Sequence, residues 1–159
     1  MPNNLRYRKA WRWPDSVERY IAGRAQGFTV HVCNGASDFG DVRIDRHSRT
    51  TDIRADLYYL PLADACADTV VSDPPWELQY QFRTRFATEV RRILRPGGLF
   101  ILAAPWCPKV PRMAIQEVLI PEWQLMAAHN VCPLWLLKKV SAPFWGGWEA
   151  VYLQEKAKS

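Results

Sequence analysis

The chain has 159 residues, 48% of them hydrophobic, and a formal net charge of +5. This length suits one domain with a real core, and this hydrophobic share excludes global disorder. No apolar run reaches the roughly 18 residues that a membrane span needs, and the N-terminus lacks the apolar core of a signal peptide, so we expect a cytoplasmic protein with no membrane association.

The positive charge permits nucleic-acid binding without proving it. Residues 7–13 alternate basic and aromatic side chains, which suits a phosphate backbone and unstacked bases. An arm that packs its rings onto the domain is the equal alternative. The cysteines are widely spaced, which favours reduced, mostly buried thiols over disulfides or a metal site; they are Cys33, Cys66, Cys107 and Cys132.

The first half of the chain predicts one helix followed by four short strands. A helix begins at Asp15 or Ser16 and stops before Gly27. Strands are predicted over residues 28–33, 42–45, 52–56 and 68–73. Three of them end in an acid, and these acids are Asp45, Asp56 and Asp73.

The turn between the first two strands contains small residues and two glycines. Strand, small-residue turn, strand and terminal acid form the opening of a nucleotide-binding α/β unit. Only ten positions separate Gly35 from Asp45, against the roughly 20 that are usual. We therefore predict that the first crossover helix is shortened or absent.

The fourth strand leads into Asp73, Pro74, Pro75 and Trp76, a set of acceptor oxygens beside one flat ring. Asp73 precedes a proline and is held extended, and the prolines have fixed φ angles and no N–H. A planar amine would suit this set, because a carboxylate and a carbonyl accept its two hydrogens while an indole stacks on its ring. The alternative is a tight turn with a core tryptophan.

The second half of the chain predicts a long helix over residues 79–94 with Phe82 in its apolar stripe. Residues 95–98 end that helix and turn the chain into a strand over 99–104. A short helix is predicted over 113–119, and a β-hairpin over 135–140 and 148–153. The arginines of the long helix are expected on a solvated face rather than on a phosphate track; they are Arg83, Arg85, Arg91 and Arg92.

Three of these segments together resemble the class I S-adenosylmethionine-dependent methyltransferases, and among them the nucleic-acid amino-methyltransferases with an Asp-Pro-Pro-Trp motif. Residues 32–37 resemble the cofactor loop, although Cys33 and Ser37 stand where glycines are usual. Residues 56–76 resemble the run from the adenine-binding acid to the catalytic tetrapeptide. Residues 92–98 resemble the turn before the fifth strand.

The resemblance implies a Rossmann-like α/β fold, mostly parallel with an antiparallel C-terminal hairpin, and S-adenosylmethionine as cofactor. It implies that the cofactor's methionine end lies on the loop formed by Cys33, Asn34, Gly35, Ala36 and Ser37. Asp45 would bind the ribose, and Asp56 with Leu57 the adenine. The alternative for Asp45 and Asp56 is a carboxylate that caps a turn.

The resemblance also implies the catalytic residues and the reaction. Residues 73–76 would hold the target amine, and Asp73 would border the cofactor as well. We expect an N-methyltransferase acting on a nucleobase amine in DNA or RNA, with adenine N6 favoured and cytosine N4 next. Residues 28–159 would be the catalytic domain, and residues 1–27 a basic aromatic arm and helix.

Other functions stay open at this point. The same acceptors suit a protein amide or a small-molecule amine, and the degenerate cofactor loop suits a protein of this fold that binds nucleic acid or a partner without turnover. A reader of sequence context would be a separate partner, a second copy of the chain, or the arm. The loop over residues 144–148 is either a base-contacting lid or part of the hairpin.

Overall fold

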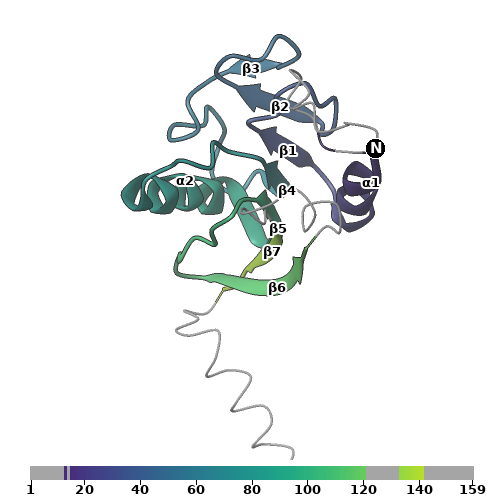
Figure 1. The fold of residues 1–159 in the computed structure, drawn as a ribbon. Coiled ribbons are helices and arrows are strands. Elements are labelled where there is room, and N and C mark those ends of the chain that lie inside the picture. The colour runs from purple at the N-terminus through teal and green to yellow at the C-terminus, as the bar shows by residue number, and fades with distance from the viewer. Residues whose placement is uncertain (1–12, 14, 121–132, 142–159) are drawn as a thin grey trace, which may run out of the picture.

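The computed structural model describes residue 13, residues 15–120 and residues 133–141. Its centre is one seven-stranded sheet of order β3-β2-β1-β4-β5-β7-β6 (Figure 1). The pairs among β1 to β5 are parallel, and β7 runs antiparallel to both of its neighbours. The predicted mostly parallel Rossmann-like sheet is confirmed. Its strands are β1 (Thr29–Val32), β2 (Val42–Asp45), β3 (Ile53–Arg54), β4 (Ala67–Ser72), β5 (Leu94–Ala103), β6 (Met113–Leu119) and β7 (Leu134–Lys139).

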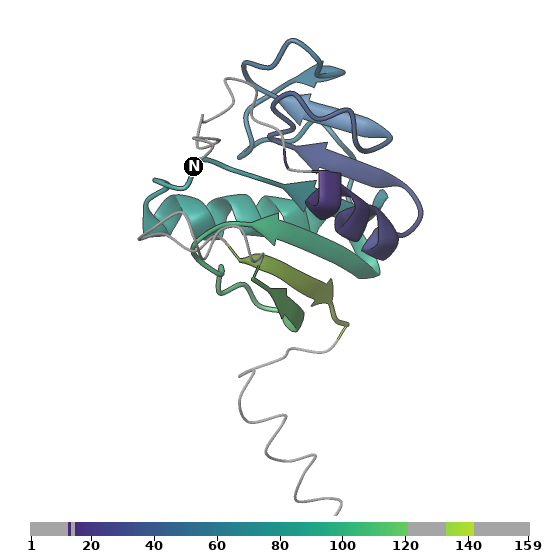
Figure 2. The same cartoon turned by 45° about the vertical axis from the view of Figure 1, so that its right-hand side comes forward.

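One helix covers each face of the sheet, α1 (Asp15–Arg24) on one side and α2 (Tyr80–Ile93) on the other (Figures 1 and 2). Val70 packs in the same cluster as Phe86 of α2, while the next residue, Val71, packs with Ile21 of α1. Successive strand residues point to opposite faces, so both faces need apolar side chains. This explains the continuous apolar runs of β4 and β5. Neither helix in the described part of the chain is long and apolar enough to cross a membrane.

Residues 33–41 connect β1 to β2 without a helix, as the short spacing predicts. Gly35 and Gly40 have φ angles of +56° and +102°, a region that favours glycine. A Cβ on Gly40 would lie 3.2 Å from the Cβ of His31. The connection can therefore turn tightly against the edge of β1.

The prediction of a helix over residues 113–119 is wrong, because this segment is the edge strand β6. It pairs antiparallel with β7, for example Ile115 with Leu137 and Val118 with Trp135. Its local sequence fits either state, and pairing with β7 decides between them. The predicted partner strand over 148–153, and residues 142–147 of its loop, lie outside the described residues, as does the arm before Trp13.

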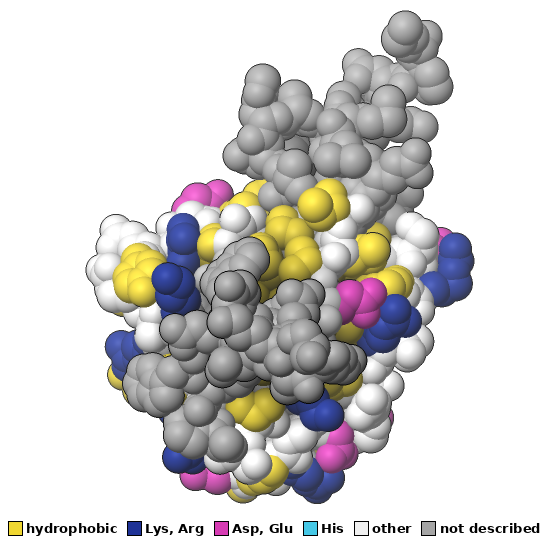
Figure 3. Space-filling model, turned by 90° about the horizontal axis from the view of Figure 1, so that it is seen from below, with side chains coloured by type: hydrophobic (Ala, Val, Ile, Leu, Met, Phe, Trp, Pro, Cys, Tyr) yellow, Lys and Arg dark blue, Asp and Glu magenta, His cyan; other side chains and the backbone are white. Residues whose placement is uncertain are grey.

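Two further details differ from the prediction. Residues 95–98 do not form a separate turn but a bulge inside β5, where Gly97 has a φ of +81°. Phe82 is 37% exposed instead of lying in the apolar stripe of α2. At the β6 edge, Figure 3 shows hydrophobic side chains at the surface; Ile115, Val118 and Ile120 are about half exposed there.

Candidate active site

The predicted site residues lie at one edge of the sheet. Residues 33–37 follow β1, Asp45 ends β2, Asp56 follows β3 and Asp73 follows β4. Because these strands are parallel neighbours, their carboxyl ends meet at one edge, where open α/β sheets bind ligands. The topology therefore brings together segments that are up to 40 positions apart in the chain.

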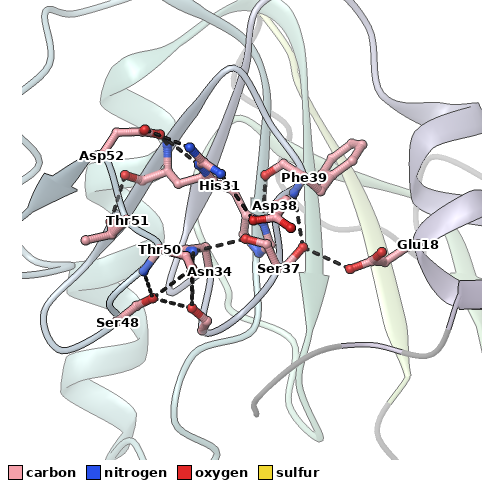
Figure 4. Close-up of polar contacts among 12 residues, drawn as sticks. Glu18, His31, Asn34, Ser37, Asp38, Phe39, Ser48, Thr50, Thr51 and Asp52 are labelled. Carbon is pink, nitrogen blue, oxygen red and sulfur yellow. Dashed lines mark hydrogen bonds and ion pairs between the residues drawn. The ribbon is translucent and has the colours of Figure 1, made fainter.

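The loop after β1 keeps its shape through side-chain hydrogen bonds (Figure 4). Asn34 is buried, and its Nδ2 donates to the carbonyls of Gly35 and Ser37 at 3.2 and 3.1 Å and to Thr50 Oγ1 at 3.2 Å. The hydroxyls of Ser48 and Thr50 also donate to the Gly35 carbonyl. These side-chain contacts connect the loop after β1 to the segment after β2, where no crossover helix is present. Ser48 and Thr50 were not predicted as site residues. The hydroxyl-rich stretch over residues 48–51 is the sequence feature that could have indicated them.

Asn34 also has one unused acceptor. Its three hydrogen bonds run to acceptor oxygens and so identify the amide nitrogen, which leaves Oδ1 as a buried acceptor with no partner in the described ranges. A buried acceptor of this kind is costly unless a donor reaches it. An ammonium group would be such a donor. The loop therefore fits the amino-acid end of S-adenosylmethionine.

Helix α1 supports the same loop from the other side. Ser37 is buried, and its hydroxyl donates to the Glu18 carboxylate at 2.9 Å while it accepts from the Phe39 amide at 3.2 Å (Figure 4). Ala36 is half-buried between these contacts. Glu18 is a site residue that the sequence reasoning missed, because nothing local connects the first turns of α1 with the loop.

Asp45 ties the loop to the end of β2. Its Oδ2 accepts from the Gly35 amide at 3.2 Å, and its Oδ1 accepts from the amides of His47 and Ser48 at 2.7 and 2.9 Å. A carboxylate has about four acceptor positions. Asp45 therefore caps a turn and still has room for one ribose hydroxyl, so the two interpretations of this residue are compatible.

Asp56, Leu57 and Cys33 line the same edge. Asp56 accepts from the Tyr58 amide at 2.9 Å, and Arg46 lies 3.9 Å from its other oxygen. Leu57 is half-buried against the core, so it offers an apolar wall. Cys33 has a φ of +59°, and burial raises the pKa of its thiol, so the thiol stays protonated and unreactive.

Asp73 is the acid that the fold perturbs most at this edge. Burial raises its pKa from the ordinary 3.8 to about 6, and hydrogen bonds from the Trp76 and Trp13 side chains oppose that rise. The Trp76 indole nitrogen lies 3.3 Å from Asp73 Oδ1. A carboxylate with this pKa is mostly ionised at neutral pH and can still take up a proton.

The rest of the tetrapeptide is held rigidly. Pro74 is buried and Pro75 exposed, and the Trp76 carbonyl accepts from the Trp106 indole at 3.2 Å. The Trp76 ring is half-buried and packs against the cluster under α1 that includes Val71. The indole N–H of this ring also donates to Asp73 Oδ1, a contact that the sequence did not predict.

His31 is a core histidine. It is 1% exposed, its Nδ1 lies 3.1 Å from the Phe39 carbonyl, and its ring stacks on Trp13 with centroids 5.0 Å apart. Burial lowers its pKa from 6.5 to about 4, so it is neutral at physiological pH. Trp13 therefore contacts both His31 and Asp73, a role that its place in a basic arm did not reveal.

In the described ranges, no group of three His, Cys, Asp or Glu side chains could hold a metal ion.

A family model described as a methyltransferase domain matches residues 21–102, just over half of the chain. No curated protein matches the sequence. The structure matches 118 solved protein chains, and three of them illustrate the shared fold at low identity. A SAM-dependent methyltransferase from Methanosarcina mazei is 12% identical with a TM-score of 0.55, and the match covers 76% of this chain and 97% of that one.

The second structure is TrmN from Thermus thermophilus, 15% identical with a TM-score of 0.56, covering 79% of this chain and 48% of that one. The third is the cyclase SpnF, 11% identical with a TM-score of 0.60, covering 80% of this chain and 81% of that one. At these identities the likeness shows the fold alone. The cyclase shows that this fold does not fix the reaction, which must be argued from the site.

Proposed function

This chain belongs to the methyltransferase domain family, within the class I S-adenosylmethionine-dependent methyltransferases, and from that premise we propose that it methylates an exocyclic amine of a nucleobase in DNA or RNA. Adenine N6 is the favoured target and cytosine N4 the next. The observation that carries the proposal is the placement of Asp73, Pro74 and Trp76 at the end of β4, beside the loop after β1.

The cofactor side of the site consists of residues 33–37, Asp45, Asp56 and Leu57. When bound, the cofactor supplies an electrophilic methyl group on a sulfonium sulfur. Asn34 Oδ1 would accept from the ammonium group of the cofactor, and Asp45 would bind a ribose hydroxyl. The loop residues and Asp45 are joined to one another by hydrogen bonds, so the loop should lose little conformational freedom on binding.

The substrate side consists of the two acceptors at residues 73 and 74. Asp73 keeps about two acceptor positions free beside its indole donors, and Pro74 contributes its carbonyl. When both hydrogens of a planar amine are bound there, its nitrogen lone pair is less delocalised into the ring and points at the donor. Positioning of this kind supplies much of the rate in a displacement.

Asp73 also has a suitable pKa for the end of the reaction. The amine becomes strongly acidic as it gains a methyl group, so its proton needs only a weak base nearby. A carboxylate with a pKa of about 6 is such a base. A target base in a duplex would have to leave the stack to reach this edge.

The test is transfer of a radiolabelled methyl group to single-stranded DNA, to RNA, to protein and to free nucleosides. We expect label in nucleic acid, recovered as N6-methyladenine after nuclease digestion, and a loss of at least about 100-fold in Asp73→Asn. Asp38→Asn is the matched control, because Asp38 lies in the loop after β1 with a side chain 72% exposed. Label found only in protein or in a small amine, or equal activity in Asp73→Asn, would contradict the proposal.

A further inference from the structure

Large aromatic side chains lie exposed beside the candidate active site. Tyr59 is 67% exposed, Tyr80 69% and Phe82 37%. Tyr59 follows β3 and the other two begin α2, so all three belong to the edge that carries Asp56 and Asp73. Scattered apolar side chains on a surface need no explanation, but a contiguous group indicates a binding surface.

Two of these side chains form one connected group with a neighbouring tyrosine and an arginine. We call this group the aromatic rim: Tyr58, Tyr59, Phe82 and Arg85. The Arg85 guanidinium carbon lies 4.5 Å from the centre of the Tyr59 ring and 5.5 Å from that of Tyr58. The rings of Tyr58 and Phe82 are 5.6 Å apart and inclined by 35°. The guanidinium thus lies over rings at the surface.

The charge of Arg85 is not neutralised by an acid in the described part of the chain. No carboxylate there lies within ion-pair distance of it, whereas Arg92 on the same helix binds Asp64 at 2.7 Å and Glu89 at 2.6 Å. The acid nearest in sequence to the rim, Asp56, pairs with Arg46. Arg85 is therefore an exposed cation that no carboxylate of the described residues neutralises, and it can bind an anion.

A second pair of a cation and a ring joins the rim to the catalytic tetrapeptide. The Arg83 guanidinium lies 5.0 Å from the centre of the Trp106 ring and donates to the Leu78 carbonyl. The Trp106 indole in turn donates to the carbonyl of Trp76. Through Arg83 and Trp106, the first turns of α2 are therefore connected to the backbone of the tetrapeptide that contains Asp73.

We propose that the aromatic rim and the Arg83 guanidinium, which lies over the buried Trp106 ring, bind a single-stranded segment of the nucleic-acid substrate next to the target base. Unpaired bases stack on the exposed rings, and phosphates meet Arg85. A paired duplex hides its base faces, so the rings favour a single strand. This inference rests on the proposed function, and it assigns Arg83 and Arg85 to substrate binding instead of to a solvated face.

The test measures binding of a fluorescein-labelled 12-nucleotide RNA, and of its DNA equivalent, by anisotropy at several salt concentrations. We expect Tyr59→Ala and Arg85→Glu to weaken binding about 10-fold, and Arg85→Gln to lower the salt slope by about one unit. Arg112→Glu is the matched control, because Arg112 is exposed before β6, at the opposite edge of the sheet. It should change affinity less than two-fold.

Tyr59 and Arg85, the two rim residues that are substituted, are exposed, so these variants should fold. Melting curves check this. Calorimetry should show unchanged S-adenosylmethionine binding. Equal weakening by Arg112→Glu, loss of cofactor binding in the rim variants, tighter binding of the same sequence as a duplex, or wild-type affinity in both rim variants would each overturn the inference.

The failure of one proposal is distinguishable from that of the other. If the rim variants bind the strand normally while Asp73→Asn abolishes its methylation, the surface is wrong and the proposed function stands. If strand binding depends on Tyr59 and Arg85 but no nucleic acid is methylated, the surface stands and the proposed function is wrong.

Discussion

The amide of Gly35 donates to Oδ2 of Asp45 at 3.2 Å, and this bond joins the turn after β1 to the end of β2. Two residues that the sequence marks as cofactor-binding thus hold each other in place without a helix between their strands. Asp45 therefore has a structural role in addition to the ribose-binding role that we propose for it, so variants of this residue should change both stability and cofactor affinity.

Asp45→Asn should weaken S-adenosylmethionine binding about 10- to 100-fold and lower the melting temperature. The asparagine side chain has only one acceptor oxygen, so it cannot accept from all three backbone N–H groups that Asp45 binds. Hydrogen bonds to a charged group are worth about 1.5–3 kcal/mol. Calorimetry and thermal melting measure the two effects. Asp38→Asn, in the same loop, should change neither. Normal cofactor affinity in Asp45→Asn would show that Asp45 only caps the turn.

The activity should depend on the ionisation of Asp73. Its pKa of about 6 predicts that kcat/KM falls as pH drops below 6, because the protonated acid loses acceptor capacity. A profile from pH 5 to 8 checks this. The residual kcat/KM of Asp73→Asn should not show this fall below pH 6, which is the acidic limb of the profile. A limb that persists in Asp73→Asn would have to be assigned to another group.

Trp76→Phe should move the same limb to higher pH. The indole N–H stabilises the ionised form of Asp73, so its removal raises the pKa of the acid further. Phenylalanine keeps a ring for packing, which separates the hydrogen bond from the hydrophobic contact. Trp135→Phe is a suitable control, because its indole donates to the Ala104 carbonyl and not to an acid. An unmoved limb in Trp76→Phe would rule out this effect of the bond.

Stability should have two opposing pH dependences between about pH 4 and 6.5. The folded protein keeps a proton on Asp73 that the unfolded chain has released above 3.8, so this group lowers stability as pH rises from 4 to 6. The unfolded chain protonates His31 below 6.5 while the folded protein keeps it neutral down to about 4. Burial of neutral His31 therefore costs stability as pH falls through that range.

Two variants separate these effects. Relative to the wild type, the free energy of unfolding should rise more steeply with pH between 4 and 6 in Asp73→Asn, and less steeply or downward in His31→Gln. Urea unfolding at several pH values measures both slopes. Equal slopes in the two variants would contradict the assignment of these pKa values.

Arg92→Lys should destabilise the protein by about 1–2 kcal/mol, more than Arg91→Lys does. The Arg92 guanidinium donates to the carbonyls of Leu60 and Leu62 and to the carboxylates of Asp64 and Glu89. A lysine ammonium cannot reach these four groups at once. Among the described residues, the Arg91 guanidinium donates to a single carbonyl, that of Pro111, at 3.0 Å. Chemical unfolding compares the two variants, and equal losses would show that the network adds nothing.

The sequence by itself determined the sheet and which strand ends carry the candidate site residues. Apolar strands that end in Asp45 and Asp73, and the short spacing after Gly35, fix a parallel sheet without a first crossover helix, because each signal is local and strongly constrained. The Asp-Pro-Pro-Trp stretch, residues 73–76, could be recognised for the same reason. The site residues so chosen do meet at one edge of the sheet.

Only the tertiary structure decided which distant groups support those residues. Residues 113–119 became a strand because β7 lies beside them, and local propensity cannot include that partner. Trp13, Glu18 and Thr50 join the site from segments whose own sequence has no sign of it. The pKa of Asp73 likewise depends on burial and on two indoles, and burial is a property of the folded chain and not of any stretch of sequence.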